Sequence, residues 1–237
     1  MSRIHFIGGE KGGVGKSVTS RLLAQYYIDR DMPLTVFDGD QSHAAMLRFY
    51  GDFSGPLDVA RFENLDQVME TAMEEDRQII VDLPAQSSRP LERWLADSDV
   101  VAIGAEMATP ITLWHVMDDG SDSLRLLERL LQTHGEGPDY VVVRNFGRGE
   151  DFSVFDKSEV KKKAKSLNAG FLDLPPLHAP TMRRIDQTGA SFWAAVNNKS
   201  ADDGPSLGLL ERQRVKVWLN RVYEGMDALH GSLQAVE

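Results

Sequence analysis

A glycine-rich segment between two regular segments is the feature that most limits how this chain can fold. Residues 10–17 read Glu-Lys-Gly-Gly-Val-Gly-Lys-Ser; they follow an apolar stretch, residues 4–7, and precede a helix-like stretch, residues 18–28. Glycines allow backbone N–H groups to turn towards phosphate oxygens, and the N-terminus of the following helix adds the positive end of a dipole. The order strand, loop, helix is the one that a P-loop requires, so the sequence predicts a site for a nucleoside triphosphate.

The side chains around these glycines suit a triphosphate with its metal ion. Lys16 would neutralise the β and γ phosphates, and the Ser17 hydroxyl is the kind of oxygen ligand that Mg²⁺ accepts beside phosphate groups. Glu10 stands where the strict pattern has glycine, so this is not the common form of the loop. A glycine-rich turn that binds nothing is the alternative. The expected nucleotide contacts in this loop are Lys11, Gly12, Gly13, Val14, Gly15, Lys16, Ser17 and Val18.

The first lysine of the loop, Lys11, makes the motif more specific. Lys-Gly-Gly-Val-Gly-Lys-Ser resembles the deviant Walker A motif of the ParA and MinD family of ATPases, within the SIMIBI class of P-loop NTPases. The resemblance implies a homodimer that forms on ATP and reverts after slow hydrolysis, with Lys11 reaching across to the partner's phosphates. In that family the residue before this lysine varies, so Glu10 is compatible. Its carboxylate should nevertheless repel a triphosphate unless it points away or meets a cation.

Two carboxylates follow the next apolar segment. Residues 34–41 read Leu-Thr-Val-Phe-Asp-Gly-Asp-Gln, a strand that ends in Asp38 and Asp40. Strand ends are where sheets of this kind place their chemistry. By resemblance to the family's switch I, Asp40 would position or polarise the attacking water and sense the γ phosphate, and Asp38 is the weaker candidate. A simple turn after the strand is the alternative.

A second strand with a terminal carboxylate spans residues 78–85, Gln-Ile-Ile-Val-Asp-Leu-Pro-Ala. Asp82 would hold Mg²⁺ through a water, as a Walker B aspartate does. The segment resembles the family's switch II, except that Gln86 stands where glycine is usual, so we expect the switch to move differently. The expected catalytic residues are thus Lys11, Lys16, Asp40 and Asp82, and the expected metal site is Ser17, Asp40 and Asp82.

Later segments resemble the family's base-binding elements. Residues 140–145 look like the strand whose terminal asparagine, here Asn145, contacts the purine. Residues 171–176 look like the family's strand and proline turn, where the backbone near Pro175 and Pro176 reads adenine. No Asn-Lys-x-Asp guanine reader follows Asn145. The expected cofactors are therefore ATP or ADP with Mg²⁺, and plain scaffold strands are the alternative.

Apolar strands alternate with helix-like stretches along the chain. This alternation predicts an α/β fold with a mainly parallel, doubly wound sheet and helices on both faces. The 237 residues, 42% of them hydrophobic, can bury a substantial core. We expect a single P-loop ATPase domain over residues 1–237, with a C-terminal helix at about residues 206–230 packed on or beside it. The expected strands are residues 3–8, 33–38, 78–83, 99–105, 139–145 and 170–174.

The final helix has an apolar stripe that suits core packing. MinD relatives end in a membrane-binding helix, so membrane or DNA contact is the alternative. Acidic residues dilute the positive charge of this helix, and the tail to Glu237 is polar, which weakens attraction to anionic lipid and makes a membrane partner the poorer interpretation. The stripe consists of Val215, Trp218, Leu219, Val222, Met226 and Leu229.

Composition narrows the choice further. The chain has no cysteine, which excludes disulfides, cysteine-ligated clusters and the cysteine-dependent relatives of this P-loop, such as the nitrogenase iron protein. No leader-like segment opens the chain, so a cytoplasmic location is expected. The net charge of −10 opposes indiscriminate binding to nucleic acid. Local basic patches at residues 161–165 and at Arg183 and Arg184 are candidates for nonspecific DNA contact, with a solvated helix face as the alternative.

Together these features predict an ATP-dependent dimerisation switch that positions or partitions DNA, a plasmid or another cargo, with an adaptor protein that stimulates hydrolysis. Residues 85–88 and 212–216 look similar to the TraL-type ATPases of conjugative plasmids, so an accessory role in conjugative transfer stays open. Another alternative is an ATP-dependent small-carboxylate ligase of the dethiobiotin or cobyrinic acid synthetase type, with Arg89 and Arg93 as carboxylate ligands. A third is a nucleotide-gated binding module without relevant hydrolysis, which Gln86 favours.

Overall fold

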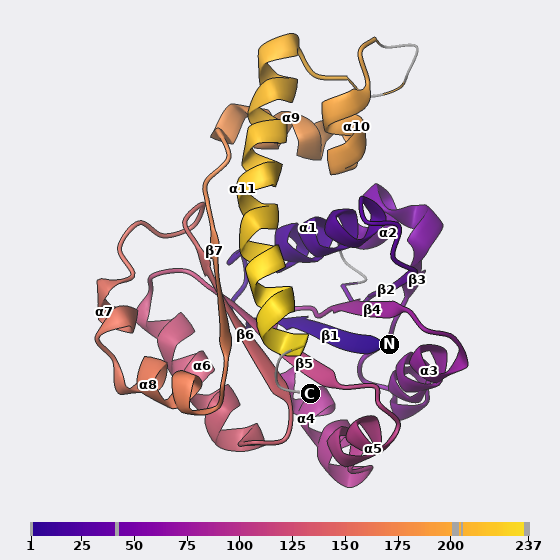
Figure 1. Cartoon of the computed structure of the whole chain (residues 1–237), viewed down its shortest axis with the longest axis vertical. Helices are drawn as coiled ribbons and strands as arrows, with labels where there is room; N and C mark the ends of the chain where they lie inside the picture. Colours follow the sequence, from indigo (N-terminus) through magenta and orange to yellow (C-terminus); the bar gives the residue numbers. More distant parts are fainter. Residues whose placement is uncertain (1, 41–42, 201–203, 205, 235–237) are drawn as a thin grey trace.

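A parallel sheet forms the centre of the protein in a computed structural model, which describes residues 2–40, 43–200, 204 and 206–234. Within these residues the sheet has seven strands in the order β3-β2-β4-β1-β5-β6-β7, and every neighbouring pair is parallel (Figure 1). β1 thus lies inside the sheet between β4 and β5. The strands are β1 (Arg3–Gly8), β2 (Leu34–Asp38), β3 (Ser54–Pro56), β4 (Gln78–Asp82), β5 (Ile111–Met117), β6 (Asp139–Asn145) and β7 (Gly170–Leu174).

Helices connect the strands and cover the sheet on both sides. The expected α/β fold, with a parallel sheet between helical layers, is confirmed. The helices of the described residues are α1 (Lys16–Ile28), α2 (Ala45–Phe49), the 3₁₀ turn η1 (Gly51–Phe53), α3 (Phe62–Glu74), α4 (Ser88–Asp97), α5 (Val100–Glu106), α6 (Ser121–His134), α7 (Ser153–Asp156), α8 (Glu159–Ser166), α9 (Ala179–Thr188), α10 (Phe192–Asn197) and α11 (Leu209–Gln234).

Strand residues alternate between two apolar clusters because successive side chains of a strand point to opposite faces. In β1, Ile4 and Phe6 belong to the cluster formed with α3, α4 and α6, whereas Ile7 belongs to the cluster formed with α1, α10 and α11. All three side chains are buried. The central strand is therefore covered on both faces, and only its carboxyl end is available for chemistry.

One expected strand is a helix. Residues 99–105 contribute to α5, and the strand beside β1 is β5. A strand inside this sheet must be buried on both faces, whereas Ile103 in α5 is 42% exposed. All residues of β5 are buried, but Thr112 and His115 interrupt its apolar run. Sequence periodicity alone does not separate a short buried strand from a helix, and these two polar residues concealed the strand.

The C-terminal helix packs on the sheet. α11 runs along β7, with its N-terminal end beside α10 (Figure 1). The six residues of its predicted apolar stripe are all buried in the cluster that contains α1. Among the helices of the described residues, none is both long enough and apolar enough to cross a bilayer. The last part of the tail, residues 235–237, lies outside the described residues.

A buried histidine joins β1 to its neighbours. Trp114 Nε1 donates a hydrogen bond to His5 Nδ1 at 3.1 Å, and His5 Nε2 lies 3.2 Å from Gln78 Oε1 and 2.9 Å from the Tyr27 hydroxyl. Because Nδ1 accepts from tryptophan, the imidazole is neutral. Burial, followed by the charge of Arg3, lowers the pKa of His5 to about 3.

We predict that this histidine makes stability depend on pH. The pKa of His5 is lower in the folded chain, about 3, than its ordinary value of 6.5. Its contribution is therefore complete above pH 6.5 and is lost as the pH falls towards 3, by about 1.4 kcal/mol per pH unit. Urea unfolding between pH 7 and pH 5 measures the slope. His5→Gln should reduce this slope by about 1.4 kcal/mol per pH unit, the contribution of one proton. An unchanged slope in that variant would contradict the lowered pKa of His5.

Candidate functional site

Three strand ends meet where the sequence predicts the site. Within the sheet register Ile7 pairs with Asp82, and Asp82 pairs with Asp38. The loop after β1, the Asp38–Asp40 segment after β2 and the carboxylate at the end of β4 therefore share one edge of the sheet. Carboxyl ends of parallel strands are where open α/β folds bind their ligands.

The glycine-rich loop has the backbone that its sequence requires. Gly15 has φ +106°, and a Cβ at this position would lie 2.2 Å from Asn145 Nδ2. Asn145 Nδ2 donates to the Val14 carbonyl at 2.7 Å, and Asn145 Oδ1 accepts from the Gly147 amide at 2.9 Å. Asn145 thus braces the loop from β6. Its predicted contact with a purine stays a prediction.

Lys16 lies inside the curve of the loop. Its Nζ donates to the carbonyl oxygens of Gly9 at 2.8 Å and Lys11 at 3.2 Å. Burial lowers the pKa of Lys16, while the carboxylates of Asp82, Asp40 and Glu10 oppose that shift. Of the remaining loop residues, Gly12 and Gly13 are exposed, Val14 is buried, and Gly15, Ser17 and Val18 are half-buried.

Asp82 has one oxygen that no hydrogen bond uses. Its Oδ1 accepts from Ser20 at 2.8 Å, whereas its Oδ2 is buried without a hydrogen-bond partner. Burial raises the pKa of Asp82 to about 6, although the Ser20 and Ser17 hydroxyls act in the opposite direction. A buried, unpartnered carboxylate oxygen near a serine hydroxyl fits a hard cation such as Mg²⁺. The described residues contain no cluster of three acidic, histidine or cysteine ligands, so Mg²⁺ here would also need phosphate or water oxygens.

The two carboxylates after β2 have different surroundings. Asp38 is buried, and it accepts hydrogen bonds from the backbone amides of Asp40, Met46 and Leu47 at 3.1, 2.8 and 3.1 Å. It therefore holds the start of α2. Asp40 is 25% exposed and lies 3.1 Å from His43 Nδ1. Asp40 remains the candidate for the attacking water, and Gln41 beside it lies outside the described residues.

Lys11 is paired within its own chain. Its Nζ donates to Asp118 Oδ2 at 2.5 Å, a hydrogen bond that raises the pKa of Lys11. The other oxygen of Asp118 accepts from the Ser123 hydroxyl at 2.6 Å and from the Gly120 amide at 3.1 Å. The predicted contact of Lys11 with a partner's phosphates therefore requires this ion pair to open.

The proline turn after β7 lines an open groove beyond the ends of β6 and β7. Asn145 and Leu174 pair at the ends of β6 and β7, so Pro175 and Pro176 follow directly beside Asn145. Trp218 Nε1 donates to the Pro175 carbonyl at 2.7 Å, which anchors the turn to α11. The groove, of about 530 Å³, is lined by Phe146, Gly149, Glu150, Asp173, Pro175, Pro176 and Arg221. Arg221 is a lining residue that the sequence did not indicate.

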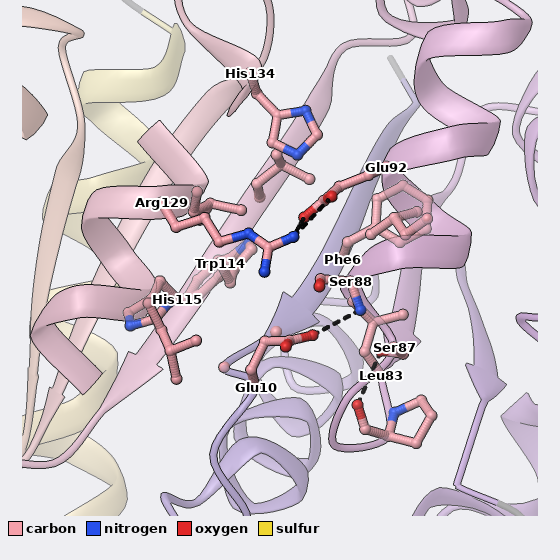
Figure 2. Close-up of a pocket in the computed structure, with 17 residues that line it drawn as sticks. Phe6, Glu10, Leu83, Ser87, Ser88, Glu92, Trp114, His115, Arg129 and His134 are labelled. Carbon is pink, nitrogen blue, oxygen red and sulfur yellow. Dashed lines mark hydrogen bonds and ion pairs between the residues drawn. The ribbon is translucent and has the colours of Figure 1, made fainter. Parts of the chain in front are cut away.

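A smaller, more enclosed cavity lies on the other side of the loop. It has about 60 Å³ and is lined by β1, α4 and α6 (Figure 2). Phe6, Leu83 and Leu130 form part of its apolar wall, and Glu92 of α4 faces Arg129 of α6 across it, with Nη2 to Oε2 at 3.3 Å. Lys16, Ser17 and Asp82 do not line this cavity. Gly9 and Glu10 do line it, so the cavity adjoins the start of the glycine-rich loop without including the residues expected at the phosphates and the metal ion.

Sequence reasoning missed three residues at this edge, Ser20, Asp118 and Gly120. Ser20 follows the motif by one helical turn, and a hydroxyl inside a helix gives no signal of its own. Asp118 and Gly120 follow β5, the strand that was not predicted. A carboxylate directly after a strand is the signal that identified Asp38 and Asp82, and it would have identified Asp118 had the strand been found.

Comparisons with known proteins agree with this geometry. The sequence matches no protein-family model. MinD from Pyrococcus horikoshii, complexed with Mg-ADP, superposes with a TM-score of 0.53 at 15% identity, covering 98% of each chain. MinD from Aquifex aeolicus also gives a TM-score of 0.53, at 16% identity, with 93% of this chain and 96% of that chain covered. The chain has the MinD/ParA-type fold. The fold that the loop residues 11–17 implied is therefore confirmed.

Two other proteins resemble the chain in sequence. Protein TraL from Escherichia coli is 24% identical over 241 residues, which cover 96% of this chain and 98% of TraL. Protein MobD from Acidithiobacillus ferrooxidans is 22% identical over 182 residues, covering 73% of this chain and 78% of MobD. The predicted similarity to TraL thus extends over nearly the whole chain.

We predict opposite effects of removing charge from the two buried aspartates. Asp82→Asn should stabilise the protein without nucleotide by about 1–3 kcal/mol, because the folded state penalises this carboxylate. Asp38→Asn should destabilise it by about 1–3 kcal/mol, because its carboxylate accepts three amide hydrogen bonds. Urea unfolding in EDTA measures both. Destabilisation by Asp82→Asn would contradict the claim that burial penalises the charged form of Asp82.

Proposed function

We propose that this chain binds ATP with Mg²⁺ at the edge where β1, β2 and β4 end. The observation that carries the proposal is the buried, unpartnered Oδ2 of Asp82 at the foot of the P-loop. Ser17 and Asp82 would hold Mg²⁺, directly and through water respectively. The Mg-ADP that accompanies MinD from P. horikoshii supports the same cofactors here. Pro175 and Pro176 would place the adenine in the groove beside Asn145.

We further propose slow ATP hydrolysis by residues of this edge. Bound Mg²⁺ would supply charge neutralisation at the β and γ phosphates. Lys16 would leave the Gly9 and Lys11 carbonyls and donate to phosphate oxygens, which concentrates positive charge where the transition state gains negative charge. Asp40, partly exposed and near enough to influence Lys16, would orient the attacking water.

The output of this chemistry would be an ATP-dependent homodimer in the cytoplasm. Lys11 supports this part, because its ammonium group already lies beside the P-loop and, among the described residues, is held by one partly exposed ion pair, with Lys11 37% and Asp118 15% exposed. A partner's triphosphate carries more negative charge than one carboxylate and would compete for Lys11. In this proposal the Lys11–Asp118 ion pair belongs to the monomer, and it opens when the dimer forms.

The cargo is proposed from the relatives. The similarity to TraL, 24% identity over an alignment that covers 96% of the chain, supports an accessory role in conjugative transfer or plasmid positioning, with an adaptor protein that stimulates hydrolysis. The basic patches give DNA contact less support: Lys161 pairs with Asp156, Lys162 with Glu159 and Arg184 with Glu211. The small-carboxylate ligase is less favoured as well, because Arg93 lies 3.9 Å from Asp97 on the same helix.

Light scattering with Mg²⁺ and a nonhydrolysable ATP analogue tests the switch. The wild-type chain should shift from monomer to dimer, and Lys11→Ala should reduce dimer formation at least about tenfold while it keeps nucleotide binding, because each of the two protomers loses a charge contact across the interface. Lys162→Ala, which removes a solvent-exposed lysine from α8, is the matched control and should dimerise normally. Unchanged dimerisation of Lys11→Ala would refute the proposed role of Lys11.

A further inference from the structure

The cap of α4 comes from the P-loop. The Ser88 amide, at the first residue of α4, donates to Glu10 Oε1 at 2.7 Å (Figure 2). Ser87, the local N-cap residue, does not cap the helix, because its hydroxyl donates to the Pro84 carbonyl at 2.9 Å. A carboxylate at a helix N-terminus satisfies a free amide and interacts favourably with the helix dipole. Glu10 therefore replaces the cap that the local sequence lacks.

The segment that leads into α4 depends on this cap. Gln86 has φ +62°, in the left-handed region that a residue with a Cβ adopts at a cost of about 1 kcal/mol. The Leu91 amide reaches the Ser87 carbonyl only at 3.4 Å, so the first turn of α4 is loosely closed. Local interactions therefore stabilise the conformation of residues 86–91 only weakly. The hydrogen bond from the Ser88 amide to Glu10 adds the stabilisation that this segment lacks.

The backbone on both sides of Glu10 is held by Lys16. The two carbonyl oxygens that Lys16 Nζ contacts belong to Gly9 and Lys11, the residues that flank Glu10. One ammonium group thus holds the peptide that carries the capping carboxylate. Any ligand that draws Lys16 away from these carbonyls also loosens the position of Glu10.

We propose that Glu10 is a positioning residue that transmits the presence of phosphate in the P-loop to α4; this rests on the proposed nucleotide function. ATP draws the Lys16 ammonium from the Gly9 and Lys11 carbonyls onto its phosphates, and the phosphate charge repels the Glu10 carboxylate. Glu10 leaves Ser88, and the first turn of α4 is released. The proposal gives a role to both departures from the usual motifs. Glu10, in place of glycine in the loop, caps α4, and Gln86, in place of glycine in switch II, makes the segment before α4 depend on that cap.

The released helix borders the apolar cavity of about 60 Å³ described above. Leu91 and Glu92 of α4 line it, and Glu92 is the residue that pairs with Arg129 of α6. Movement of the first turn of α4 therefore acts on a wall of this cavity and on the ion pair across it (Figure 2). Phosphate binding would therefore change the contact between α4 and α6, at a cavity whose lining contains none of the proposed nucleotide contacts.

Amide hydrogen exchange of Ser88 and Arg89, followed by NMR, tests the proposal with three forms of the full chain. In the wild type, exchange should become about fivefold faster when Mg²⁺ and a nonhydrolysable ATP analogue are added, the factor that an ordinary helix cap supplies. Glu10→Ala should exchange fast with and without the analogue. Glu10→Gln keeps an oxygen acceptor but no charge, so it removes the repulsion and keeps the loss of the Lys16 contacts; the analogue should accelerate its exchange less than in the wild type.

A control and a second set of amides separate the possible failures. Glu63→Gln removes an exposed carboxylate from the first turn of α3 and should behave as the wild type. If the analogue protects the amides of residues 12–17 but leaves Ser88 unchanged in the wild type, the relay is wrong and nucleotide binding stands. If residues 12–17 show no response, the proposed function itself fails. Melting temperatures of the variants show whether a change in exchange reflects general loss of structure.

Discussion

The parallel register of β1, β4 and β2 places Ile7, Asp82 and Asp38 side by side at one edge of the sheet, and the rest of the site depends on it. The loop after β1 can curve around Lys16 only because the strand that carries it ends there, and Asp82 lies below that loop because β4 ends in the same row. A shift of one residue in β4 would turn its carboxylate to the opposite face. Burial of both faces of β1 and β4 makes that shift costly.

Burial at this edge leaves charges that a ligand would satisfy. Asp82 has a buried oxygen without a partner, and Lys16 directs its ammonium at backbone carbonyls. Both arrangements are poor compared with contacts to a metal ion and phosphate, respectively, because isolated charges are expensive to bury. In Asp38, in contrast, both carboxylate oxygens accept hydrogen bonds from backbone amides, so this residue has a structural role. The same residue type thus has a binding or a structural role according to its hydrogen bonds.

Contiguous motifs were predictable from the sequence, whereas contacts across the fold were not. Lys16, Ser17 and Asp82 follow directly from strand, loop and helix patterns. The partners of Lys11 and Glu10 lie 107 and 78 residues away, at Asp118 and Ser88, and no local pattern connects them. The strand before Asp118 was also concealed by its own buried polar residues. Asn145 was predicted at the end of its strand, but its hydrogen bond to the Val14 carbonyl depends on how β6 lies beside the loop, which no local pattern predicts.

Calorimetric titration of the chain with ATP, in the presence and absence of Mg²⁺, tests the central claim most directly. The account predicts one ATP per chain, bound at least about tenfold more tightly with Mg²⁺, because the ion adds contacts to Ser17 and Asp82 as well as to the phosphates. Lys16→Ala should lose most of this affinity in both conditions. Absence of ATP binding by the wild type, or equal binding by Lys16→Ala, would contradict the assignment of this edge as a magnesium–nucleotide site.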